Sequence, residues 1–450
     1  MASAAEQLAA NLRLDTFRRA RDLHKRIGFT VLAMIVFRLG TYVPIPGIDV
    51  AAFAAAFESQ EKGILGMFNM FSGGAVQRMA IFSLNVMPYI SASIMVQLMG
   101  TAYPPWEKLR KEGGEAGRRT LNEYTRYITV VLAVLQALAI ANGLQATPGL
   151  VLNPGPVFIL STVSTLTGGT MLLTWVGEQV TNRGIGNGVS LIIFAGIVAV
   201  LPRGVSQMIA MVRTGALSSA AVALILVLAV GVILVIVFME RSQRRLLTQY
   251  PRRAQGGRAF GGEASFLPLK INSSGVMAPI FASSLLLLPT TAVSFLAAAD
   301  LPAWASWVPG VAGELQHGKP AFIALYGVLI VFFCFFYTSV MFNPQEVAEN
   351  LRKFGGFLPG LRPGKQTAAY LDHVMTRVTV VGAVYITSVC LLPEVLIAYY
   401  NIPFYLGGTS ILIVVSVTMD TVAAMQSHLV SHQYEGLIRK TRLRRARQDA

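Results

Sequence analysis

The sequence predicts an all-α polytopic membrane protein with ten transmembrane helices. Its 450 residues are 54% hydrophobic and 13% charged, whereas roughly a quarter of the residues of soluble proteins are charged. Apolar runs that could cross a bilayer core of ~30 Å, at ~1.5 Å per helical residue, recur along the whole chain. They cover residues 27–43, 80–99, 128–144, 157–176, 189–201, 219–239, 275–298, 321–342, 378–392 and 404–425.

Two of these runs are short for a membrane span. The fifth has 13 residues and the ninth has 15, whereas a spanning helix needs about 20 residues. We therefore expect these two helices to begin in the flanking polar segments or to be recessed within the bundle.

The positive charges predict which side of the membrane each loop faces. Of the 37 lysine and arginine residues, 31 lie in the two terminal segments and in alternate loops, the largest being residues 100–127, 240–272 and 343–377. Because loops rich in positive charge stay in the cytosol, we expect both termini and these loops to be cytosolic. The first apolar run is longer than the core of a signal peptide and no small-residue cleavage pattern follows it, so we expect this helix to be retained. Residues 1–26 before it are expected to form an amphipathic cytosolic arm.

The second run is joined directly to a segment that is too short and too polar to cross a membrane. Residues 71–79 are interrupted by Ser72, Gly73, Gln77 and Arg78. In lipid such a segment would leave backbone groups without hydrogen bonds, so it is tolerated only inside protein or along a water-filled cavity. The sequence therefore predicts a pore, with this short segment lying inside it.

Ionisable residues are scarce in the expected spans, which argues against an enzyme or an ion-coupled transporter. Arg38 lies in the first run and Asp420 near the end of the last. They could form a coupling pair, but we favour a buried structural pair or snorkelling to the interface. The histidines lie in loops and tails, and Cys334 and Cys390 are interpreted as packing residues. The sequence thus predicts no catalytic residue, no metal ligand and no cofactor.

Two glycine-rich stretches resemble nucleotide-binding loops only superficially. GIGNG (residues 184–188) and GGEAGRRT (residues 113–120) match neither GxxxxGK[ST] nor a GxGxxG that follows a strand. If transport through the pore requires energy from nucleotide hydrolysis, we therefore expect another protein to be the motor.

Six long stretches that lie in order along the chain resemble a known family. They are FSGGAVQRMAIFSL, VMPYISASIMVQL, GEQVTNRGIGNGVSLIIFAGI, FLPLKINSSGV, NPQEVAENLRKFGGFLPGLRPG and GGTSILIVV. The chain closely resembles the SecY family, the central subunits of the bacterial protein-export channel. The resemblance implies two pseudo-symmetric five-helix halves around a central pore, residues 27–213 and 214–425, followed by a basic cytosolic tail, residues 426–450.

The resemblance implies a constriction ring of six β-branched aliphatic side chains in this pore. Such a collar makes no hydrogen bonds to a passing chain and discourages continuous water and ions. The first four members form two i,i+4 pairs, and we expect each pair to lie on one helix face. Without the resemblance, each would be an ordinary lipid or core contact. The ring consists of Val86, Ile90, Val189, Ile193, Ile280 and Ile413.

The resemblance also implies a plug, a short helix on the exterior side of the pore. Gly73 and Gly74 allow hinge-like backbone dihedrals, so we expect the plug to be displaced. The alternative is a re-entrant cap that never moves. The plug comprises Phe68, Asn69, Met70, Phe71, Ser72, Gly73, Gly74, Ala75, Val76, Gln77, Arg78 and Met79.

A lateral seam is implied between the second and third runs on one side and the seventh and eighth on the other. Gln97 and Asn272 are candidate polar contacts near this seam. Lone amides of this kind also form ordinary helix–helix hydrogen bonds.

Two cytosolic loops resemble the docking loops of the family for the ribosome and for the SecA ATPase. Arg258 in loop 240–272 and Arg362 in loop 343–377 are the candidate contacts, because flanking Gly and Pro hold each on an exposed turn. Gly257 stands where members of the family often have a second arginine, which removes half of that contact.

The implied function is a protein-conducting channel and not an enzyme. It would pass unfolded, signal-sequence-bearing polypeptides across the bacterial inner (plasma) membrane and release apolar segments sideways into membrane lipids. The implied partners are SecE, SecG, SecA and the ribosome. The alternative is a secondary transporter of a small solute, which would need polar ligands at the bilayer midplane; an intramembrane protease would need a catalytic pair within the spans. Neither set of residues is found in the spans.

Overall fold

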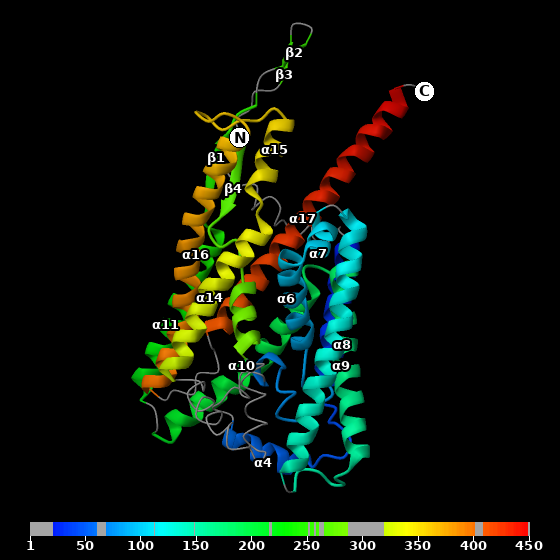
Figure 1. Ribbon diagram of the computed structural model, residues 1–450, viewed down its shortest axis with the longest axis vertical. Helices are drawn as coiled ribbons and strands as arrows, with labels where there is room; N and C mark the ends of the chain where they lie inside the picture. The colour runs from blue at the N-terminus through cyan, green and yellow to red at the C-terminus, as the bar shows by residue number, and fades with distance from the viewer. Residues whose placement is uncertain are drawn as a thin grey trace. The chain divides into compact units, whose positions relative to one another are not determined.

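The protein is mostly helical, as Figure 1 shows. The computed structural model describes residues 21–60, 69–111, 113–147, 149–215, 218–250, 253–255, 258–260, 265–286, 319–400 and 408–448. The chain divides into two compact units. Unit 1 comprises Met1–Tyr89, Tyr127–Pro202 and Val417–Ala450, and unit 2 comprises Ile90–Arg126 and Arg203–Ser416.

Unit 1 contains most of the helices from the first half of the chain. Helix α9 begins at Pro156, whose fixed φ suits the first helical position. The helices are α3 (Arg21–Gly40), α4 (Val50–Gln60), α9 (Pro156–Arg183) and the larger parts of α8 (Gly114–Ala146), α10 (Gly188–Arg213) and α17 (Gly408–Gln448).

The core of unit 1 connects the segment after α3 with α8, α9 and the segment that precedes α6. Two isolated backbone bridges, Pro44 with Ala80 and Ile48 with Val151, hold these connecting segments together. Around them lies one hydrophobic cluster, which consists of Ile45, Ile48, Met79, Leu84, Ala137, Leu144, Leu150, Phe158 and Leu166.

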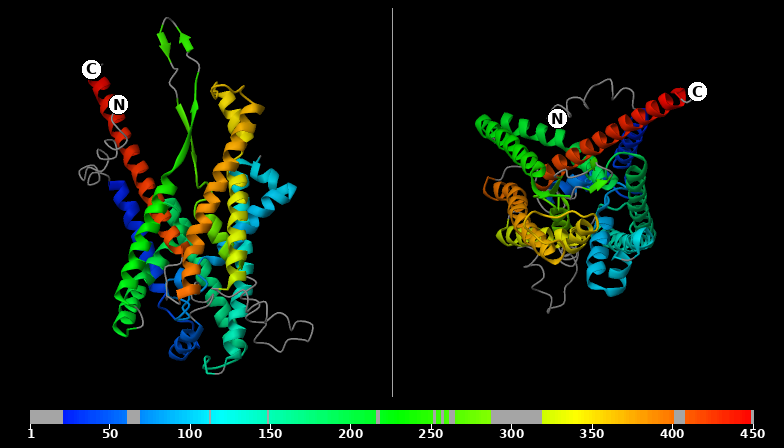
Figure 2. Two further views of the ribbon diagram at one scale, coloured as in Figure 1. Left: turned by 90° about the vertical axis from the view of Figure 1, so that its left-hand side faces the viewer. Right: turned by 90° about the horizontal axis from the view of Figure 1, so that it is seen from above.

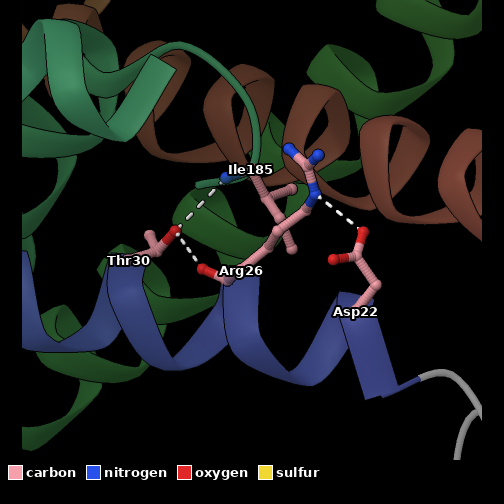
Figure 3. A network of polar contacts seen from close by, with 4 residues as sticks. All are labelled: Asp22, Arg26, Thr30 and Ile185. Atoms are coloured by element: carbon pink, nitrogen blue, oxygen red, sulfur yellow. Dashed lines mark hydrogen bonds and ion pairs between the residues drawn. The ribbon is translucent and has the colours of Figure 1, made fainter. Parts of the chain in front are cut away.

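Polar contacts fasten α3 to the turn between α9 and α10 (Figure 3). Thr30 Oγ1 donates to the carbonyl oxygen of Arg26 at 2.9 Å and accepts from the backbone N–H of Ile185 at 3.2 Å. Arg26 Nε lies 3.2 Å from Asp22 Oδ2, one helical turn away. The GIGNG stretch is therefore a tight connection between two helices, held by α3.

Unit 2 contains the remaining described helices and the four described strands. Ser218 caps α11 by accepting from the backbone N–H of Ala221, and Asn343 caps α15 by accepting from that of Gln345. The helices are α6 (Met87–Ala102, from Ile90), α7 (Pro104–Lys111), α11 (Ser219–Arg241), Met277–Leu286, α14 (Pro320–Met341), α15 (Pro344–Lys353) and α16 (Lys365–Tyr400).

A β-hairpin occupies the loop between α11 and the helix Met277–Leu286, and the sequence did not predict it. Strand β1 (Gln243–Thr248) pairs antiparallel with β4 (Ser265–Lys270), and β2 (Arg253–Gln255) pairs with β3 (Arg258–Phe260). Figure 2 shows the two strand pairs in line, with β2–β3 beyond β1–β4.

Seven helices of the described residues are long and apolar enough to span a membrane. They confirm the third to sixth and the eighth to tenth expected runs. They are Gly114–Gln145, Pro156–Arg183, Gly188–Arg213, Ser219–Arg241, Pro320–Lys353, Lys365–Pro393 and Gly408–Val430.

The two short runs gain their length in different ways. The ninth helix begins at Lys365, in the polar segment before its apolar run, as expected. The fifth helix, α10, instead continues past the end of its run to Arg213. Residues outside the apolar run therefore supply the missing turns in both cases, before the run in the ninth helix and after it in the fifth.

The three other expected runs form shorter or more polar helices. Helix α3 has 20 residues and carries charges in its first and last turns. The apolar helix Met277–Leu286 covers the start of the seventh run, and residues 287–298 lie outside the described residues. The second run was expected to be helical from residue 80, but α6 begins at Met87 because residues 81–86 form turns, with a φ of 50° at Asn85.

Candidate pore and plug

The segment that precedes α6 is a buried run of turns within unit 1. Among its described residues, only Asn69–Phe71 are helical, and 69–77 are all buried. Gly73 and Gly74 follow with φ values of 69° and 84°, a left-handed conformation that ends a helix and favours glycine. The expected plug helix is thus a single described turn followed by a compact coil, and Phe68 lies outside the described residues.

Side chains of the segment satisfy several of its own backbone groups. Asn69 Oδ1 accepts from the backbone N–H of Gln77 at 3.0 Å. Ser72 Oγ donates to the carbonyl oxygen of Asn69 at 3.1 Å and accepts from the N–H of Val76 at 3.3 Å. The polar residues that made the segment unsuitable for lipid therefore supply the hydrogen bonds that a buried coil requires.

Two side chains from outside the plug segment bind its carbonyl oxygens. Asn85 Nδ2 donates to the carbonyl oxygen of Phe71 at 2.6 Å, and Arg38 Nη1 of α3 donates to that of Gly73 at 2.6 Å. Asn85 itself is buried. The plug segment is therefore tied to the rest of unit 1 at its centre and not only at its ends.

Glycines in two helices of unit 1 allow this coil to approach closely. A Cβ at Gly196 of α10 would overlap the carbonyl oxygen of Phe71, and one at Gly169 of α9 would overlap that of Ile81. Sequence reasoning did not single out these glycines or Asn85. The two glycines could have been found from the sequence only because each lies inside a predicted span, where glycine often marks close helix packing.

Arg38 and Asp420 do not form the ion pair considered from the sequence. Besides its bond to Gly73, Arg38 donates from Nη2 to the hydroxyl oxygen of Tyr42 at 2.8 Å, and the Asp420 side chain is exposed. The buried structural pair, one of the two favoured interpretations, was therefore wrong, and snorkelling to the interface stays a prediction. The Arg38 guanidinium instead donates to two neutral oxygens, one in the plug segment and one on Tyr42, two residues past the end of α3.

The six candidate ring residues are divided equally between the two units. Val86, Val189 and Ile193 belong to unit 1, and Ile90, Ile280 and Ile413 belong to unit 2. All are buried except Val189, which is half-buried.

The expected helical pairing of the ring residues holds for one pair only. Val189 and Ile193 both lie in α10. Val86 instead immediately precedes α6, so Val86 and Ile90 do not share one continuous helix face. The turns that end at Val86 explain the difference.

The two candidate gate residues both lie in unit 2 and have partners there. Gln97 Nε2 donates to Ser93 Oγ of its own helix at 3.2 Å. Asn272 is buried; its Nδ2 donates to Glu240 Oε1 at 2.5 Å, and its Oδ1 accepts from the N–H of Gly275 at 2.9 Å. Asn272 therefore anchors the start of the helix Met277–Leu286 to the end of α11.

The two candidate docking loops pack against each other. Gln249 and Phe357 exchange two backbone hydrogen bonds, at 2.9 and 3.0 Å, and a cluster that includes Leu246 and Leu358 lies between the loops. The two loops therefore form a single packed structure within unit 2.

Of the two candidate docking arginines, one is exposed on this structure and the other lies at the tip of its hairpin. Arg362 is exposed, and its carbonyl oxygen accepts from Thr367 Oγ1 at 2.9 Å. Arg258 begins β3 and pairs with Gln255 across the tip of the hairpin.

Comparison with known sequences decides the family. The family model for SecY matches residues 80–422. The protein translocase subunit SecY of Vibrio cholerae is 50% identical over 424 residues, which cover 94% of this chain and 95% of the relative. The corresponding subunit of Escherichia coli is 49% identical over 426 residues, with the same coverage of both chains. The chain belongs to the SecY family.

Solved structures agree with the fold expected for a SecY-family chain. A protein-conducting channel matches with a TM-score of 0.67 at 16% identity, over 91% of this chain and 93% of that one. Sec61 in a canine ribosome–channel complex matches with a TM-score of 0.63 at 16% identity and the same coverage. The ten-helix membrane fold predicted from the sequence is that of this family, and the chain is a channel subunit and not an enzyme.

Gly169→Ala tests the close approach of the segment before α6. The added methyl group should force Ile81 away and cost about 1–3 kcal/mol, as overpacking of a core does. The measurement is the thermal unfolding midpoint of the purified protein in detergent.

Gly168→Ala is the matched control, because a Cβ at this neighbouring glycine of α9 meets nothing within 4 Å. It should leave the midpoint unchanged or raise it, since alanine favours a helix by up to about 1 kcal/mol over glycine. Equal effects of the two substitutions would contradict the close approach.

Proposed function

We propose that this SecY-family chain passes unfolded polypeptides across the membrane through a pore that the segment at residues 68–79 closes at rest. The observation that carries the proposal is the burial of this polar coil among apolar helices of unit 1. Ser72 is fully buried, and backbone groups of the segment are hydrogen-bonded by the side chains of Asn69, Asn85 and Arg38. Non-helical backbone at membrane depth is expected where it lines or fills a cavity.

A pore is required by the energetics of the cargo. One charged side chain at the centre of the bilayer costs about 2.5–3.5 kcal/mol on insertion scales. A secreted polypeptide with several charges therefore could not cross unaided, and a water-filled path removes this barrier. An apolar segment has the opposite preference, so a side opening would release it into lipid without recognition of its sequence.

The ring proposed for the constriction consists of Val86, Ile90, Val189, Ile193, Ile280 and Ile413. In this proposal the half formed by residues 27–213 supplies the first four members and the half formed by residues 214–425 supplies the last two. Their branched aliphatic side chains would resist a continuous column of water at rest and would bind no particular sequence in transit.

The lateral gate is proposed to open along the seam next to α6 and the helix Met277–Leu286. Gln97 in α6 donates to Ser93 one turn away, and in this proposal it exchanges that bond for one across the seam when the gate closes. Asn272 makes three side-chain hydrogen bonds, one of them to Glu240, which suits a fixed hinge of the gate better than a contact that breaks.

The cytosolic loops are proposed to dock the ribosome and the SecA ATPase, with Arg258 and Arg362 as contacts. The exposed Arg362 and the hairpin that carries Arg258 belong to one packed structure. Canine Sec61 and yeast Ssh1, which share the fold, were both solved with ribosomes. SecE and SecG are the proposed small membrane subunits, and the bacterial inner membrane, with both chain termini in the cytosol, is the proposed location.

Reconstitution tests the proposed function. The purified chain is placed in vesicles with SecE and SecG and supplied with SecA, ATP and an unfolded preprotein that carries a signal sequence. We expect the preprotein to become protected from added protease inside the vesicles. Uptake of a small solute by the same vesicles, without preprotein import, would instead support the secondary transporter.

The ring is tested by the conductance of the resting channel. Replacing Ile193, Ile280 and Ile413 with serine should raise resting ion conductance several-fold in planar bilayers, because the constriction then admits water.

Val227→Ser in α11 is the control, since Val227 is 70% exposed and faces away from the protein interior. Unchanged conductance of the triple variant, with import intact, would show that these three side chains do not form the seal.

A further inference from the structure

The charged end of Arg38 has an unusual set of partners for a residue in an apolar helix. It lies in the last turn of α3, within the sequence FTVLAMIVFRLG. Its two terminal nitrogens donate to neutral oxygens, Nη1 to the carbonyl of Gly73 and Nη2 to the hydroxyl of Tyr42, at 2.6 and 2.8 Å. Hydrogen bonds from a charged donor are about twice as strong as neutral ones.

Tyr42 receives a second guanidinium, from the plug segment itself. The Cζ atom of Arg78 lies 4.0 Å from the centre of the Tyr42 ring, and that of Arg38 lies 4.8 Å from it. Both distances fall within the ~6 Å range of a cation–π interaction. One aromatic ring beside α3 therefore contacts a cation fixed on the helix and a cation carried by the plug segment.

These polar contacts hold the plug segment at two points, in addition to its close packing against the helices of unit 1. The bond to Gly73 fixes the turn where φ is positive, and the stacking of Arg78 fixes the segment near its end. Both contacts are polar and directional, so they break over a small displacement. The two guanidinium groups contact the same ring, so their mutual repulsion offsets part of the cation–π attraction. The closed position is therefore stabilised only modestly, and the segment can still leave it.

We propose that Arg38 and Tyr42 form a latch that sets how often the plug segment leaves its seat in the resting channel. The inference rests on the proposed function, since it assumes that this segment is the plug. Both are positioning residues, because they act on the plug and not on the passing polypeptide.

Cysteine labelling measures the latch directly. In a chain with Cys334→Ala and Cys390→Ala, which removes both native cysteines, Ser72→Cys places a thiol at a fully buried position. The rate at which a water-soluble maleimide modifies it in membranes reports how often the segment is unseated. Resting ion conductance is the second readout.

Graded variants separate the parts of the latch. Arg38→Gln should raise the labelling rate at least about tenfold, which corresponds to about 1.4 kcal/mol. Arg38→Lys keeps the charge but not the two-armed geometry and should give a smaller rise. Tyr42→Phe keeps the ring beneath Arg78 and loses only the hydroxyl, so it should also give a smaller rise.

A double-mutant cycle tests whether Tyr42 and Arg78 act through each other. Tyr42→Leu and Arg78→Gln should each raise the labelling rate, and the double variant should raise it by less than the product of the two. Simple multiplication of the two effects would overturn the role of the shared ring.

A charge control and a fold control accompany these variants. Arg213→Gln removes the same charge from an exposed residue at the end of α10, and it should leave both readouts unchanged. The thermal unfolding midpoint reports folding. If Arg38→Gln does not accumulate, Tyr42→Phe carries the test, because it removes a single hydroxyl.

The outcomes distinguish the latch from the proposed function. Normal labelling and conductance in the Arg38 and Tyr42 variants, while the parent chain imports preprotein, would overturn the latch and leave the channel intact. If the parent chain imports no preprotein but the Arg38 and Tyr42 variants are labelled faster, the latch is supported as a local contact. The same result would overturn the proposed function.

Discussion

The structure depends on one constraint, which is that a non-helical backbone inside a membrane protein must find its hydrogen-bond partners within the protein. Residues 69–86 are turns and coil after the first helical turn, yet nearly all of them are buried. Asn69, Ser72 and Asn85 bind backbone groups of the segment itself, and Arg38 of α3 binds one of its carbonyl oxygens from outside. Each unsatisfied group would cost several kcal/mol in hydrocarbon, so these side chains decide whether the coil can exist there.

The same constraint explains why the helices around the coil carry glycine. Backbone hydrogen bonds and close packing require the coil to lie directly against helix backbones, and Gly169 and Gly196 leave room for it. The coil is thus held by contacts of main-chain atoms with small residues and by a few polar bonds. Such contacts are lost together when the segment moves. This behaviour suits a plug that switches between a closed and an open position better than a permanent part of the core.

The sequence predicted the fold class, the order of the spans and the buried position of the polar segment, because length, hydropathy and charge alone determine these features. It did not predict that α6 starts at Met87, since the positive φ of Asn85 depends on contacts made in the folded chain. The partner of Arg38 was also missed. Every residue has a backbone carbonyl, so the sequence gives no sign that the carbonyl of Gly73, 35 residues away, is the partner. An acidic residue such as Asp420 is instead an obvious candidate partner for an arginine. The β-hairpin in loop 240–272 was missed because its strands are short and its burial depends on the neighbouring loop.

The central claim is that the buried segment must leave its seat for a polypeptide to pass. The most direct test joins Tyr42→Cys and Arg78→Cys, whose native side chains lie in contact, with a short cleavable bis-maleimide in a chain that lacks Cys334 and Cys390. Preprotein import into vesicles is then measured before and after the linker is cut. The account predicts that import is blocked while the linker is intact and returns when it is cleaved. Import at the full rate through the linked chain would contradict it.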